Sequence, residues 1–155
     1  MPGYRKLAAA LLLALSLGIG IAFDNDMETR ILNEASARYG NEAQGRVKSW
    51  FKVIHAAAAL SEADKLRVVN SFFNTLPNVE DSAHWGIEDY WATPLELIGS
   101  NGGDCEDFAL AKYFTLRELG VPDARLRITY VKAYLRSSRQ VQSHMVLSYY
   151  ATTDA

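Results

Sequence analysis

The sequence predicts an α+β domain in which a helical N-terminal lobe precedes a central helix packed on an antiparallel sheet. Three observations lead to this fold class. Apolar residues recur at helical spacing through residues 26–76, the pair Gly102–Gly103 precedes another patterned helix, and the apolar period changes to two after Pro122. The 155 residues are 49% hydrophobic and 22% charged, which is typical of one ordered globular domain.

The N-terminus has the pattern of a signal peptide. Arg5 and Lys6 form a positive start, residues 7–21 are apolar, and small residues precede a predicted cleavage after Ala22. An apolar helix of about 15 residues would be roughly 23 Å long, shorter than the ~30 Å hydrocarbon core, so a retained anchor is the weaker alternative. We therefore expect residues 1–22 to direct export and residues 23–155 to form the mature domain.

The charge of the chain excludes one class of partner. The formal net charge is -2, and removal of Arg5 and Lys6 with the leader changes it to -4. Because the domain is mildly acidic and has no basic patch, we expect no nucleic-acid partner.

Three helices are predicted in the N-terminal lobe. The first spans residues 26–39 and ends before Gly40, and the second spans residues 42–60. The third starts after the capping residue Ser61 and reaches about Leu76.

A loop-like, aromatic segment follows at residues 78–101. Within it, Thr93, Pro94 and Glu96 form a strong helix start, which predicts a short helix to about Gly99. The aromatic residues of the segment have two interpretations: they cover the core, or they line a cleft and offer an indole N–H to an oxyanion. They are Trp85, Tyr90 and Trp91.

The remaining elements are a helix and two strands. The helix runs from about Cys105 to Leu119, and its broad apolar stripe predicts a central position. Alternating residues at 126–130 and in the run 141–150 predict two strands, and the polar stretch 136–140 suits a hairpin turn between them.

Cys105 is the single cysteine of the chain, and it stands at the predicted start of a helix. A helix start favours a thiolate, and together with a nearby imidazolium it can lower a thiol pKa toward neutrality. In an exported protein a lone thiol forms no internal disulfide. The alternative is that Cys105 is a small buried apolar residue.

His144 is the best candidate for the base. It lies on a predicted strand after the cysteine helix, and the order Cys then His is that of papain-like thiol enzymes. His84 lies in the aromatic segment. His55 lies near the apolar face of the second helix, where we expect a partly buried, hydrogen-bonded structural histidine.

Three acids, Asp104, Glu106 and Asp107, surround the thiol in the sequence. Like charges would raise the thiol pKa and oppose its activation unless a divalent cation neutralises them. The alternative is that Asp104 is an N-cap and that the other two are first-turn acids favoured by the helix dipole.

The motifs Asn101–Ala109, His84–Pro94 and Ser143–Leu147 closely resemble those of the LapG family of bacterial transglutaminase-like cysteine proteinases. The resemblance covers essentially all of the mature chain. It implies a papain-like, transglutaminase-like fold with Cys105 as the nucleophile and His144 as the base. It also implies a calcium site with Asp104 and Glu106 as ligands.

The resemblance further implies a function, namely a periplasmic, calcium-dependent endopeptidase. Such an enzyme clips a large surface adhesin near its N-terminus and so promotes biofilm detachment. An inner-membrane receptor for cyclic di-GMP sequesters it through a periplasmic domain. From this resemblance we expect Ca²⁺ as the cofactor, and the adhesin and the receptor as partners.

The third residue of the family's triad is an aspartate on the strand after the histidine strand. Asp154 is too close to His144 to occupy that place, so we expect a truncated sequence that lacks C-terminal strands, with Asp154 as a substitute orienter as the alternative. We expect reduced activity for this form. Two other functions stay open: a non-catalytic binding module, and a transglutaminase that transfers the acyl group to an amine.

Overall fold

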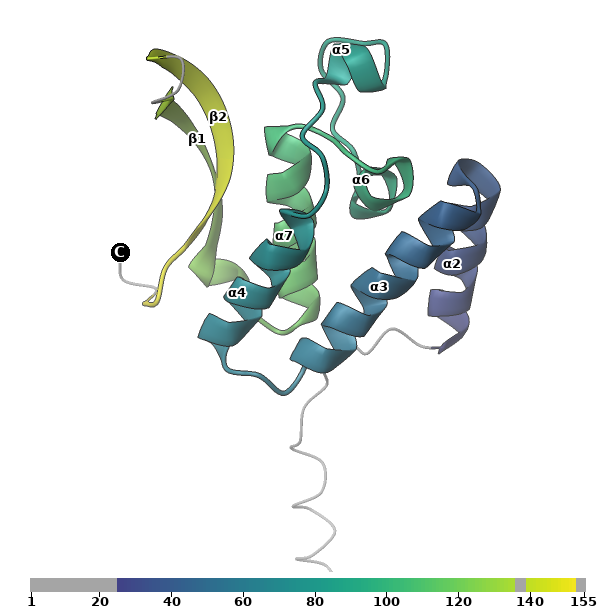
Figure 1. Cartoon of the computed structure of the whole chain (residues 1–155). Coiled ribbons are helices and arrows are strands. Elements are labelled where there is room, and N and C mark those ends of the chain that lie inside the picture. Colours follow the sequence, from purple (N-terminus) through teal and green to yellow (C-terminus); the bar gives the residue numbers. More distant parts are fainter. Residues whose placement is uncertain (1–24, 136–138, 153–155) are drawn as a thin grey trace, which may run out of the picture.

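The computed structural model describes residues 25–135 and 139–152. The predicted signal peptide and Asp154 lie outside the described residues. No helix within the described ranges is long and apolar enough to cross a membrane. The elements in chain order are α2 (Asn25–Tyr39), α3 (Asn41–Ala57), α4 (Glu62–Phe73), α5 (Asp81–His84), α6 (Pro94–Ser100), α7 (Cys105–Glu118), the 3-10 turn η1 (Asp123–Arg125), β1 (Leu126–Leu135) and β2 (Gln140–Tyr149) (Figure 1).

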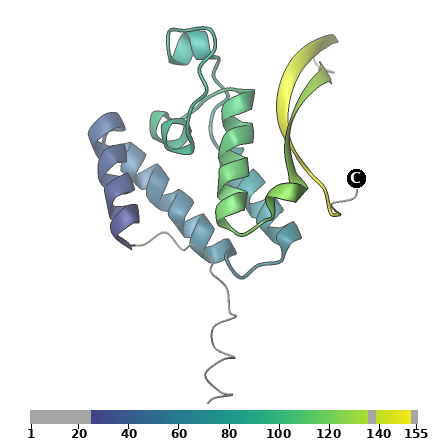
Figure 2. The ribbon, with the colours of Figure 1, turned by 180° about the vertical axis from the view of Figure 1, so that it is seen from behind.

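Helix α7 lies between the helical lobe and the sheet. In both views α2, α3 and α6 are on one side of α7, and the two strands are on the other (Figure 1 and Figure 2). The strands pair antiparallel, with Leu126 opposite Tyr149 and Val131 opposite His144. This arrangement confirms the predicted α+β class, the hairpin and the central position of the helix. Residues 136–138 of the predicted turn lie outside the described ranges.

Two predicted helix starts are confirmed by their caps. The Ser61 hydroxyl accepts the N–H of Asp64 at 3.2 Å, and the Thr93 hydroxyl accepts the N–H of Glu96 at 3.3 Å. The predicted ends of α3 and α4 are each three residues too late. After each helix the chain tightens into a turn with i to i+3 bonds, such as Leu76 N–H to the Phe73 carbonyl, which satisfies the last carbonyls but ends the α-helix.

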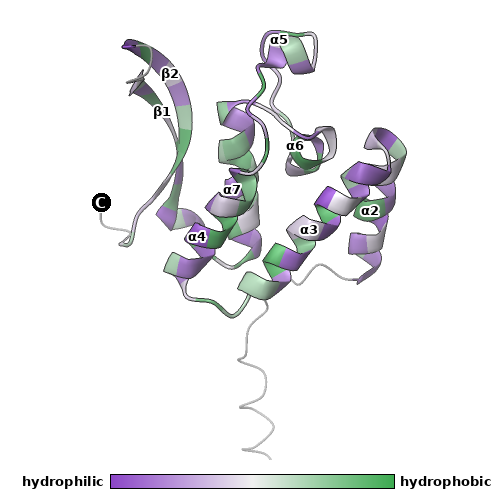
Figure 3. Ribbon diagram, viewed as in Figure 1, coloured by the Kyte–Doolittle hydropathy of each residue, from purple (hydrophilic) through white to green (hydrophobic). Residues whose placement is uncertain are grey.

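The core fills the space between α3, α4, α6 and α7. Figure 3 shows hydrophobic and hydrophilic residues interleaved along these helices, as expected for helices with one buried face. A buried hydrogen bond from Trp50 Nε1 to Thr115 Oγ1, 3.0 Å long, joins α3 to α7. Because α7 is anchored on this core, its first residue is held in a fixed place. The core includes Val47, Phe51, Val69, Phe73, Leu97, Ile98, Ala111 and Leu116.

Candidate active site

The segment before α7 is tied to the helical lobe by backbone hydrogen bonds. Asn101 ends α6 in the left-handed conformation, with a φ of 64°. The N–H of Gly102 then donates to the Leu97 carbonyl at 3.1 Å, and the Val79 N–H donates to the Gly103 carbonyl at 2.9 Å. These bonds fix the path of the chain into α7, whose first residue is Cys105.

Gly103 is required by a close approach rather than by its φ. A Cβ at this position would collide with the carboxylate of Asp107 and with the Leu97 side chain. Asp107 is fully buried, and its two oxygens accept the N–H groups of Ala92 at 2.7 Å and Asp104 at 3.2 Å. The glycine therefore makes room for a carboxylate that joins the segment before α6 to the start of α7.

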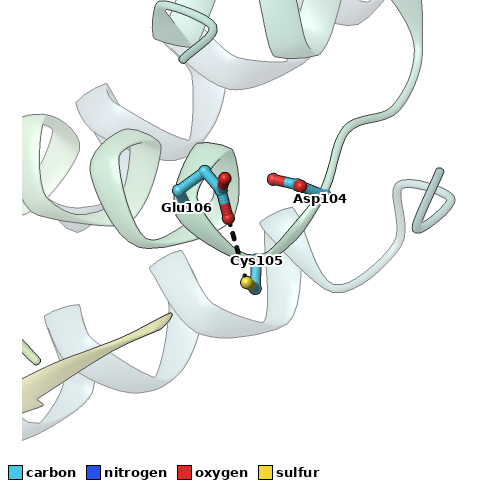
Figure 4. A group of neighbouring side chains, drawn as sticks. All are labelled: Asp104, Cys105 and Glu106. Atoms are coloured by element: carbon cyan, nitrogen blue, oxygen red, sulfur yellow. Dashed lines mark hydrogen bonds between the residues drawn. The ribbon is translucent and has the colours of Figure 1, made fainter. Parts of the chain in front are cut away.

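The Cys105 thiol is half-buried and has two polar contacts. Its S–H donates to Glu106 Oε2 at 3.0 Å (Figure 4), and its sulfur accepts the backbone N–H of Met145 at 3.3 Å. The second contact comes from β2. It places the sulfur beside the strand that carries His144, as the sequence order predicts.

Burial and the neighbouring acids both raise the pKa of the Cys105 thiol. Burial raises the pKa of Cys105, the hydrogen bond to Glu106 and the charges of Glu106 and Asp104 raise it further, and the result is about 11. The Met145 N–H lowers the pKa but does not compensate. In the metal-free arrangement the pKa of the thiol therefore shifts opposite to the direction that a helix start favours, with burial as the largest cause and the neighbouring acids, as expected from their charge, as the next.

Cys105 and His144 line the same cavity, which has a volume of about 320 Å³. His144 Nδ1 is buried and has no hydrogen-bond partner among the residues that the structure describes. The catalytic roles of both residues stay predictions. The other residues that line the cavity are Asn70, Phe108, Ala109, Lys112, Met145, Val146 and Leu147.

Acidic side chains crowd the start of α7. Figure 4 shows the Asp104 and Glu106 carboxylates near the thiol of Cys105, and potential ligand atoms of these three residues lie within 4.8 Å of one another. Asp81 belongs to two further groups of this kind, one with Asp104 and Asp107. Within the described ranges, no lysine or arginine forms an ion pair with these four acids.

The donor set fits a hard cation. Burial raises the pKa of Asp104 to about 7, with the hydrogen bond and the charge of Glu106 as the next causes, and one oxygen of Asp104 is buried without a partner among the described residues. Carboxylate oxygens are the ligands that Ca²⁺ prefers. A cation here would relieve the repulsion and satisfy the unpaired oxygen.

The other histidines lie elsewhere. His55 is hydrogen-bonded to Glu28 at 2.7 Å, but its side chain is 56% exposed, so the expectation of partial burial is wrong. Its ring lies on the solvent side of the contact between α2 and α3. His84 Nε2 is hydrogen-bonded to Ser100 Oγ at 2.7 Å.

The aromatic residues of the segment 81–91 are absent from the described lining of the Cys105 cavity. Trp85 and Tyr90 pack on each other with ring centroids 4.6 Å apart, and the Tyr90 hydroxyl donates to Glu96 at 3.0 Å. Trp91 is 52% exposed. These contacts favour the interpretation that Trp85 and Tyr90 cover the lobe.

Sequence reasoning missed Asp81 and Met145. The helix α5 that carries Asp81 is a single turn, too short to give a periodic pattern. Met145 contributes a backbone N–H, and since nearly every residue has one, the residue type gives no signal of this role. Only the packing of β2 on α7 brings it to the sulfur.

Comparisons with known proteins show the family and the solved structures to which the chain is similar. Residues 35–154 match the family described as bacterial transglutaminase-like cysteine proteinase BTLCP. The solved structure of Legionella pneumophila LapG is similar at 38% identity and a TM-score of 0.68, over 83% of this chain and 68% of that chain. An EGTA-treated form of the Legionella protein gives the same identity and TM-score, over 83% of this chain and 66% of that chain.

A calcium-bound form of Legionella pneumophila LapG is similar at 39% identity and a TM-score of 0.66, over 81% of this chain and 66% of that chain. The chain thus spans about two thirds of the length of these Legionella proteins. No curated protein matches the sequence.

Proposed function

Since the chain belongs to the bacterial transglutaminase-like cysteine proteinase family, we propose that it is a calcium-dependent endopeptidase with Cys105 as its nucleophile and His144 as its base. Family membership and the similarity to LapG confirm the resemblance and the transglutaminase-like α+β fold expected from the sequence. The observation that carries the proposal is the single cavity lined by both Cys105 and His144.

The proposed reaction is acyl transfer to water through a thioester. His144 takes the proton of the Cys105 thiol, and the sulfur attacks the peptide carbonyl carbon. Backbone N–H groups at the start of α7 stabilise the resulting oxyanion. The C–N bond then breaks, and His144 donates its proton to the leaving amine. Water, deprotonated by His144, hydrolyses the thioester and restores the thiol.

The calcium proposal assigns Asp104 and Glu106 as ligands. When bound, the ion supplies positive charge that neutralises both carboxylates and favours the thiolate. In the metal-free arrangement Glu106 accepts a hydrogen bond from the Cys105 S–H. If Glu106 bound calcium instead, the thiol proton would be available to His144. The support is the crowded acidic set and the existence of a calcium-bound form of the Legionella protein.

The biological setting is proposed from the family resemblance. We place the enzyme in the periplasm, to which residues 1–22 would direct it as a signal peptide. Its proposed substrate is the N-terminal region of a large surface adhesin, and cleavage would promote biofilm detachment. An inner-membrane cyclic di-GMP receptor is the proposed regulator, which sequesters the enzyme through a periplasmic domain.

A non-catalytic binding module is the second candidate. It is favoured by one observation, the hydrogen bond that the Cys105 thiol donates to Glu106 at 3.0 Å. Burial and this hydrogen bond raise the pKa of the thiol to about 11. A protein held in this state would dock on an adhesin or on the receptor without cutting either, because the thiolate is scarce at neutral pH.

The deciding experiment incubates the exported protein with an adhesin N-terminal fragment in calcium and in EGTA. The protease proposal expects cleavage that is lost in EGTA, in Cys105→Ala and in His144→Ala. His55→Ala is the matched control and should cleave normally, since His55 is exposed on α3. Binding without cleavage would identify the module, and incorporation of an added amine without hydrolysis would identify a transglutaminase.

A further inference from the structure

Asp81 lies among the acids of α7 although it belongs to a different segment. It is the first residue of α5, which lies at the end of the molecule where α7 begins (Figure 1 and Figure 2). Its carboxylate is within 4.8 Å of those of Asp104 and Asp107 in one group, and of Asp89 and Glu106 in another. Asp81 is thus the member that the two groups share.

The hydrogen bonds distinguish Asp81 from Asp107. Both oxygens of Asp107 accept backbone N–H groups, so this carboxylate already has its partners and acts as a positioning residue. Asp81 uses only Oδ2, which accepts the Tyr90 N–H at 2.6 Å. Its Oδ1 is buried and has no hydrogen-bond partner within the described part of the chain.

An unpaired carboxylate oxygen at this depth needs a partner. Asp81 is only 2% exposed, so water satisfies it poorly, and no lysine or arginine in the described ranges forms an ion pair with it. Buried polar atoms are nearly always paired, because leaving one unpaired costs free energy. Asp104 Oδ1 is in the same condition. Two such oxygens in one acidic cluster indicate a cation.

We propose that Asp81 Oδ1 is a ligand of the calcium ion, together with Asp104 and Glu106, and that the ion thereby joins the segment 81–91 to the start of α7. This inference rests on the proposed calcium site. Three carboxylates from two segments suit a hard cation with several oxygen ligands. Because Asp81 also holds the Tyr90 N–H, ion binding stabilises this segment as well as the helix start.

The first test measures binding of Ca²⁺ alone by calorimetry to the full chain and its Asp81→Asn variant. The asparagine oxygen can still accept the Tyr90 N–H, so the fold should persist, which thermal unfolding in EGTA verifies. We expect the dissociation constant to rise at least about tenfold, because charge count sets calcium affinity. The matched control Glu80→Gln, at the exposed neighbouring acid, should bind as the wild type does.

The outcomes separate this inference from the proposed calcium site. If the wild type binds no calcium, the calcium site and this inference both fail. If the wild type binds calcium and Asp81→Asn binds it equally well, only the role of Asp81 is overturned.

A second measurement uses the wild type and covers the case in which Asp81→Asn does not fold. Hydrogen exchange with and without calcium reports the protection of residues 81–91, including the Tyr90 amide. Slower exchange of this segment on calcium binding supports the inference. Calcium binding with unchanged exchange there, while the start of α7 gains protection, overturns it.

Discussion

Helices α6 and α7 begin with the same local device but have opposite electrostatics. At α6, Thr93 and Glu96 exchange hydrogen bonds. Glu96 Oε1 also accepts hydrogen bonds from the Tyr90 hydroxyl at 3.0 Å and from Arg38 Nη2 at 3.0 Å. Burial opposes the ionisation of Glu96, but the hydrogen bonds outweigh it and the pKa of Glu96 falls below its usual range. The carboxylate at the start of α6 thus has a protein cation as partner.

At α7, Asp104 and Asp107 stand at the equivalent positions, with Glu106 and Asp81 beside them. Burial and mutual repulsion raise the pKa values of Asp104 and Asp107. No described arginine or lysine forms an ion pair with these acids, in contrast to Arg38 at α6. This difference supports the proposal of a cation at the start of α7, and under that proposal the cation controls the thiol.

The largest expected effect is on the reactivity of Cys105. With a pKa of about 11, roughly one thiol in 10⁴ is ionised at pH 7, and alkylation in EGTA should keep accelerating up to about pH 11. Calcium should accelerate alkylation by iodoacetamide at pH 7 at least about tenfold, since one pKa unit is a factor of ten. Glu106→Gln should be faster than the wild type in EGTA. Equal wild-type rates with and without calcium would contradict the comparison.

The next effect is on stability, through the close approach that seats Asp107. Gly103→Ala should destabilise the fold by about 2 to 4 kcal/mol, because the new methyl group meets a buried carboxylate and Leu97. The measurement is denaturant unfolding. Gly45→Ala in α3 is the matched control, since its added Cβ meets nothing within 4 Å, and it should stabilise by about 0.5 to 1 kcal/mol. Similar effects of the two substitutions would refute this role of Gly103.

A smaller effect concerns pH. In EGTA, folded Asp104 keeps its proton to about pH 7, whereas the unfolded chain releases it near 3.8. The contribution of Asp104 to stability is therefore largest at low pH and falls as the pH rises from about 4 to 7. Across this pH window the free energy of unfolding of the wild type should fall by about 1 to 2 kcal/mol relative to that of Asp104→Asn. Thermal unfolding of both proteins at several pH values measures this change. A difference in stability between the two proteins that stays constant with pH would contradict the raised pKa of Asp104.

The smallest effect tests α6. Arg38→Ala removes one partner of Glu96 but leaves Tyr90 and Thr93, so we expect a small loss in the free energy of unfolding at neutral pH that still exceeds the loss in the control. Arg67→Ala is the control, because its pair with Asp64 is exposed and should contribute less than about 0.5 kcal/mol. Chemical unfolding measures both. A loss no larger than that of the control would show that Arg38 is dispensable for Glu96.

Local sequence determined most of the fold of this protein. The caps at Ser61 and Thr93, the glycine break before Cys105 and the period-two strands are each specified by neighbouring residues, so their prediction needed no tertiary contact. The ends of α3 and α4 were less predictable, because the α-helix and the turn that follows it differ only in whether an N–H bonds the carbonyl four or three residues earlier.

Within the candidate site, the sequence alone determined that a lone cysteine starts a helix among acids and that a histidine lies on a later strand. Tertiary structure decided which groups meet: Met145 N–H at the sulfur, Asp81 beside Asp104, and Asp107 with both oxygens in use. It also decided the direction of the Cys105 pKa. The reason is physical: desolvation and through-space repulsion depend on burial and distance, which residue order does not fix.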